Sequence, residues 1–178
     1  MSDPFVLYES ATTQADLYRR QGGVHEGFGA FMSEPAVDPE SVDLSAIVNP
    51  TPEKEDFLKL AFSTRFHVVY GNFGSNPFGP GNNIMFAFDQ VDNRLRMGRI
   101  TEAIGEHVLP PSLNVTSSSV TFTGGDDLDI IFTSTPHTYT RQVNGDPDAE
   151  PVRVYNIQAR KVGETSVFYN YFVVPISF

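Results

Sequence analysis

The stretch VRVYNIQARKVGETSVFYNYFVVPISF, residues 152–178, decides the fold class of this chain. Its first part alternates: Val152, Val154 and Asn156 share one face of a strand. A polar turn over 161–165 follows, and then 166–174 is β-branched and aromatic almost throughout. Alternation predicts a strand with one wet face, whereas apolar residues on both faces predict a strand that is covered on both sides. We therefore expect a hairpin whose second strand is central or interfacial.

The chain from residue 61 onward carries the same kind of pattern. Short apolar and β-branched runs are separated by turn signals such as Gly124-Gly125-Asp126-Asp127, at the spacing of a sandwich or barrel. We expect a first strand over 62–73 with Phe62, Phe66, Val68 and Tyr70 on one face. A fourth strand is expected over 115–123, and a sixth begins after Pro136. The prediction for 51–178 is an all-β domain of about eight antiparallel strands, arranged as a sandwich, a jelly roll or a barrel.

Two short helices are expected before this domain. Thr51-Pro52-Glu53 combines a capping side chain, a proline at the first helical position and an acid in the first turn. The helix that it opens runs through Phe57, Leu58 and Leu60. A second helix is predicted over 15–21, where Thr13 can act as the cap and Gly22-Gly23 ends the segment.

Residues 1–50 read as an extended N-terminal arm. Their glycines and prolines disfavour regular elements, yet the segment is too apolar for a solvated tail. Such an arm is expected to lie on its own domain or on a neighbouring subunit. The side chains that we expect to contact a partner are the large apolar ones: Phe5, Leu7, Tyr8, Leu17, Tyr18, Phe28, Phe31 and Met32.

Charge and composition restrict the partners. The 178 residues carry a net charge of −10 and no cysteine. Residues 1–60 contribute −7 of that charge, from 11 acidic and four basic residues. So acidic a chain should repel nucleic acid and anionic membranes. No signal peptide and no membrane-spanning run is present in the sequence, which predicts synthesis in the cytoplasm and other protein subunits as partners.

No arrangement of residues in the sequence indicates a catalytic or cofactor-binding site. The four histidines are scattered, and no nucleophile elbow or phosphate-binding loop occurs. The acidic loops 126–129 and 146–150 have the composition of a calcium loop, but solvated turns favour the same residues. We therefore predict no catalytic residue, no metal and no cofactor.

One basic cluster stands out in the β region, at Arg94, Arg96 and Arg99. Arg94 and Arg96 share a strand face, and Arg99 joins them only if a bulge at Gly98 resets the phase. Three interpretations are open: a solvent face paired with nearby acids, a carboxylate clamp for a ligand, or a dock for an acidic arm of a neighbour. Arg94 and Arg96 therefore count among the candidate partner contacts.

Together these patterns favour a non-enzymatic structural subunit of a large assembly. A capsid or tail component of a virion is the expected type, because such proteins often combine a β domain with an arm that crosses neighbours. The alternative is a lipocalin-like barrel whose phenylalanines line a cavity for a small apolar ligand. An enzyme that uses scattered polar residues is the third reading.

Overall fold

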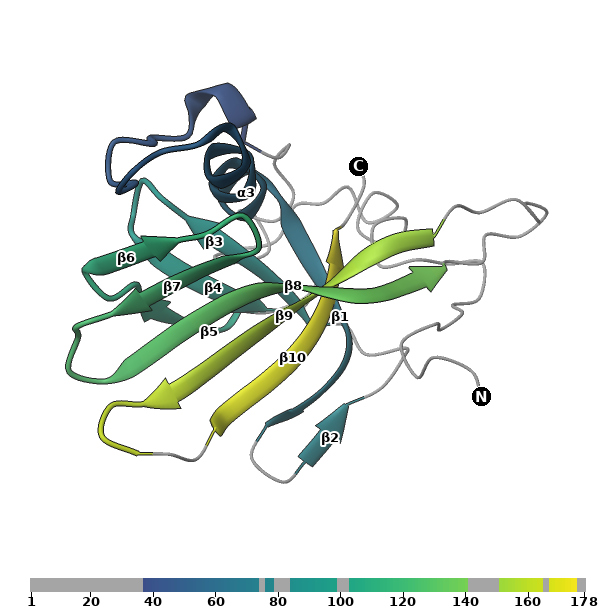
Figure 1. Cartoon of the computed structure of the whole chain (residues 1–178). Coiled ribbons are helices and arrows are strands. Elements are labelled where there is room, and N and C mark those ends of the chain that lie inside the picture. The colour runs from purple at the N-terminus through teal and green to yellow at the C-terminus, as the bar shows by residue number, and fades with distance from the viewer. Residues whose placement is uncertain are drawn as a thin grey trace.

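The computed structural model describes residues 37–73, 76–78, 84–98, 103–140, 151–164 and 167–175. It confirms the all-β prediction. Within these ranges ten strands, more than the eight expected, form one antiparallel sheet (Figure 1). The strands are β1 Arg65–Phe73, β2 Asn76–Phe78, β3 Met85–Asp89, β4 Arg94–Gly98, β5 Ala103–Val108, β6 Ser112–Val115, β7 Ser119–Thr123, β8 Leu128–Thr140, β9 Pro151–Lys161 and β10 Val167–Pro175.

The last strand is central, as the sequence predicts. The order in the sheet is β5-β4-β3-β1-β10-β9-β8-β7-β6, with β2 paired to β1 beside this path. Four strands therefore lie on each side of β10. Tyr169, Tyr171 and Val173 are buried on one face of β10, and Val174 is buried on the other. The two-sided apolar pattern of this segment thus reflects burial on both faces.

The sheet curls strongly on itself. Phe88 of β3 stacks on Phe122 of β7 with ring centroids 5.8 Å apart. In a flat sheet these strands would lie about 24 Å apart, at about 4.8 Å for each strand spacing. We call the enclosed side the inner face; it carries Phe66, Phe86 and Phe132. The edge strands β5 and β6 follow each other through residues 109–111, but among the described residues they do not pair, so the sheet does not close.

The helix α3, Pro52–Ser63, covers one end of the inner face, next to β3, β6 and β7 (Figure 1). It begins as predicted: the Thr51 hydroxyl accepts a hydrogen bond from the Lys54 amide at 3.2 Å, and Pro52 occupies the first turn. Phe57 and Phe62 bury their rings among those of the strands. The helix predicted over 15–21 lies outside the described residues.

Residues 37–50 pack with the β domain, although the sequence places them in the arm. Val42 and Ile47 are buried in the main core. Gln90 holds the backbone of Asp43 with two hydrogen bonds, of 2.8 and 2.9 Å. A short 3-10 helix, η1 Pro39–Ser41, rests against α3. The arm that the sequence predicts can therefore include no more than residues 1–36, which lie outside the described part of the chain.

Three strand expectations were wrong in detail. Phe62 belongs to α3, and a register shift between Val68 and Tyr70 turns Tyr70 away from the inner face. The expected strand over 115–123 divides into β6 and β7. Pro136 does not begin a new strand, because β8 runs through it at a bulge between Ser134 and Thr138. Bulges tolerate proline because the ladder hydrogen bonds are already interrupted there.

Candidate functional site

The basic cluster of β4 is an ion-pair network. One Arg96 guanidinium nitrogen contacts Glu106 of β5 at 2.9 Å, and another contacts Asp92 at 2.7 Å and Asp89 at 3.3 Å. Asp89 ends β3 and lies directly opposite Arg94 in the ladder, so three consecutive strands supply the charges. Only 20% of the Arg96 side chain and 12% of Asp89 are exposed, so water screens this pair less than a surface pair.

Arg94 lies on the same strand face, as predicted, and reaches Glu106 at 3.7 Å. Because the Arg96 guanidinium already faces three carboxylates of its own sheet, a ligand carboxylate or an acidic segment would have to compete with them. The third arginine, Arg99, lies outside the described residues. The ion pairs of the cluster therefore connect β3, β4 and β5 and can stabilise this three-stranded meander without a bound ligand.

The inner face is filled by aromatic side chains. Ring centroids of neighbouring pairs lie 5.0 to 6.3 Å apart, and the pairs connect β1, β3, β7, β8, β9 and β10 with α3. Rings at these separations are in direct contact. The residues involved are Phe57, Phe62, Phe66, Phe86, Phe88, Phe122, Phe132, Tyr155, Tyr169 and Tyr171. Side chains thus occupy the space in which a lipocalin-like barrel would hold its ligand.

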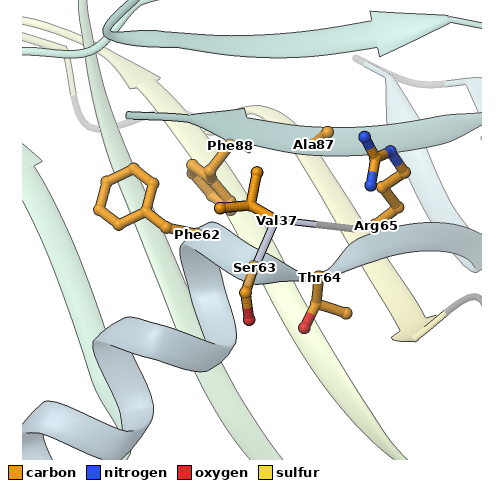
Figure 2. A pocket seen from close by; sticks show the side chains of 7 residues that line it. All are labelled: Val37, Phe62, Ser63, Thr64, Arg65, Ala87 and Phe88. Carbon is orange, nitrogen blue, oxygen red and sulfur yellow. The ribbon is translucent and has the colours of Figure 1, made fainter. Parts of the chain in front are cut away.

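A small depression lies where α3 meets β1. Its free volume is about 10 Å³, the size of a single water site and far below the roughly 300–1,000 Å³ of ligand pockets. Figure 2 shows Val37 beside Phe88, with Arg65 on the neighbouring strand. A metabolite does not fit into a space of this size. The residues that line it are Val37, Phe62, Ser63, Thr64, Arg65, Ala87 and Phe88.

Burial shifts the titration of four groups on the inner face; it raises the pKa of Tyr155, although the charge of Arg153 opposes this. It raises the pKa of Tyr169 far above the usual range and raises the pKa of Tyr171 to about 12. Burial also lowers the pKa of His107, although the charge of Asp127 opposes this. These shifts disfavour the charged forms, which is what an apolar interior does and not what a general acid–base pair near neutral pH requires.

The histidines do not meet in the described structure. His67 is buried on β1, His107 lies on β5 and His137 on β8, whereas His25 falls outside the described residues. Across the described ranges, no group of three or more His, Asp or Glu side chains is placed to hold a metal ion. The acidic turn 126–129 lies within these ranges, and the acidic loop 146–150 lies outside them.

The opposite side of the sheet carries a second apolar cluster, which we call the outer cluster: Val69, Tyr139, Val154 and Val174. These residues come from β1, β8, β9 and β10, and all four are fully buried. His67 and Met85 are buried beside them, in register with each other on β1 and β3. Among the described residues, both helices lie on the inner side instead. Two sequence signals pointed to this second face: the alternation of Val152 and Val154, and the two-sided apolar pattern of 166–174.

The eight apolar arm residues that we expect to contact a partner, Phe5, Leu7, Tyr8, Leu17, Tyr18, Phe28, Phe31 and Met32, lie outside the described residues. Comparisons with protein-family models, with curated proteins and with solved structures found no match. A membrane-spanning helix is not found in the part of the chain that the structure describes.

Proposed function

We propose that this chain is a non-enzymatic structural subunit of a larger protein assembly, in which residues 1–36 contact neighbouring subunits. The observation that carries the proposal is the filled inner face. A curled sheet of this size could enclose a ligand, but here aromatic rings from α3 and at least six strands contact one another across it. The surfaces that remain for function are therefore external.

Two external features suit protein contacts. The edge strands β5 and β6 present backbone edges with no partner strand among the described residues. Such edges accept a strand from another chain. Exposed apolar side chains are the second feature: Tyr70 on β1 is 42% exposed, and Val108 on the edge strand β5 is 60% exposed. By analogy of architecture alone, a β domain with an apolar N-terminal arm suits a capsid or tail component of a virion.

The native mass of the purified protein tests the proposal. We expect a particle with several copies or partners, and loss of that particle when residues 1–36 are deleted and Val37 is kept. Deletion to residue 50 is unsuitable because it removes Val42 and Ile47 from the core. A stable monomer that retains an apolar fluorescent probe in its interior would instead establish the ligand-binding barrel.

A further inference from the structure

The outer cluster is a buried apolar surface that needs a cover. Its four residues lie on four neighbouring strands: Val69 on β1, Val174 on β10, Val154 on β9 and Tyr139 on β8. None of the helices in the described ranges lies on this side of the sheet. Apolar side chains that are fully buried are excluded from water by other parts of the protein. We propose that residues 1–36 of the same chain cover the outer cluster in the free subunit.

The point at which the described chain begins favours this segment. Val37 lines the depression at the start of β1 together with Arg65 and Ala87 (Figure 2). Arg65 and Ala87 are paired across β1 and β3, and they share their face with the Arg96 network, which is the outer face. The 36 preceding residues are therefore tethered at the rim of the surface that needs a cover.

Length and composition also fit. Thirty-six extended residues can span up to about 120 Å, whereas four neighbouring strands measure about 15 Å across. The segment is rich in large apolar residues, including Phe28, Phe31 and Met32 close to the tether. Gly22, Gly23, Gly27 and Gly29 allow its backbone to follow a sheet surface closely.

Tethering favours the same segment. A segment joined to the rim of this face has a high effective concentration there, which favours its own chain over a second copy. This inference holds for a monomer and does not rest on the proposed function.

Cross-linking tests the placement, because the chain has no natural cysteine. Tyr70 lies at the margin of the outer face and is 42% exposed. Full-length chains would carry Tyr70→Cys with either Ala11→Cys or Gln21→Cys and be treated with a short bis-maleimide. The matched control places the fixed cysteine at Val91→Cys, which is 94% exposed in the β3–β4 turn. We expect links within one chain from Tyr70→Cys, with a yield that does not change on about tenfold dilution, and few from Val91→Cys.

Mixing two populations that differ in tag identifies the source of the segment. Links formed only between tagged and untagged chains would assign the cover to a second copy and overturn the inference. Equal yields from the two fixed positions, or no links from either, would also overturn it. A monomer with the internal link keeps this inference and overturns the proposed assembly. An assembly whose links join only different copies does the reverse.

Discussion

The imidazole of His107 stacks on the ring of Tyr169, with centroids 6.0 Å apart and an interplanar angle of 30°. His107 lies on the edge strand β5, and Tyr169 lies on the central strand β10, four strand positions away. Only the curl of the sheet brings them together. The contact buries a titratable group against an aromatic surface, which lowers the pKa of His107.

This contact predicts a loss of stability in acid. The unfolded chain binds a proton at His107 near its ordinary pKa of about 6.5, whereas the folded chain binds it only at lower pH. The unfolded state therefore holds more protons in this window, so the free energy of unfolding falls as pH drops through about 6.5. We expect His107→Gln to flatten this dependence in urea titrations at pH 5 and pH 8. His137→Gln controls for the loss of a histidine elsewhere, and equal slopes in wild type and His107→Gln would contradict the stacking.

The Arg96 network should contribute to stability. Arg96→Ala leaves Asp89, which is largely buried, without its cation and removes contacts between β3, β4 and β5. We expect the free energy of unfolding to fall by about 1–2 kcal/mol. Arg94→Ala is the matched control, because its pair with Glu106 is exposed and longer, and it should cost less than about 0.5 kcal/mol. If both variants unfold like the wild type but one fails to assemble, the cluster serves a partner instead.

The aromatic interior should be far more sensitive than the outer face to truncation. Phe132 is fully buried and contacts Phe57, Phe66 and Phe88, so Phe132→Ala should cost about 3–5 kcal/mol. The sequence predicts a similar place for Phe172, but the structure leaves Phe172 half-buried beside Tyr70. We expect Phe172→Ala to cost about 1–2 kcal/mol. Similar melting temperatures for the two variants would show that the inner face is not the main core.

The β7–β8 turn contains a glycine with two constraints. Gly124 has φ +86°, and a Cβ there would lie 2.9 Å from the Ser112 hydroxyl of β6. Gly163 in the β9–β10 turn has φ +83° but open space around it. Gly163→Ala should therefore cost about 1 kcal/mol from the backbone alone, and Gly124→Ala should cost measurably more. Thermal melts of the two variants make the comparison, and Ser112→Gly should rescue part of the difference. Equal losses of stability in Gly124→Ala and Gly163→Ala would contradict the steric contact with Ser112.

The elements that sequence reasoning predicted well are those with a local cause. The cap and proline of Thr51-Pro52 set the start of α3, because the groups that they satisfy lie within one turn. The two-sided apolar pattern of β10 predicted a central strand, because only a strand with neighbours on both faces can bury Tyr171 and Val174 together. Arg94 and Arg96 were expected on one face from the period of a strand, and they share it.

Other features depend on pairing between distant segments, which no local pattern encodes. The bulge at Val68–Tyr70 reverses the side on which Tyr70 lies, and the bulge near Pro136 keeps β8 continuous; both arise from the register with β9 and β10. Val42 and Ile47 look like parts of an arm until the curled sheet and α3 enclose them. The all-β class and the burial of β10 on both faces thus follow from the sequence alone. Long-range packing decides the curl of the sheet, because side chains four strands apart come into contact only in the assembled sheet. This curl stacks His107 on Tyr169, fills the interior with aromatic rings and leaves a second apolar face on the outer side.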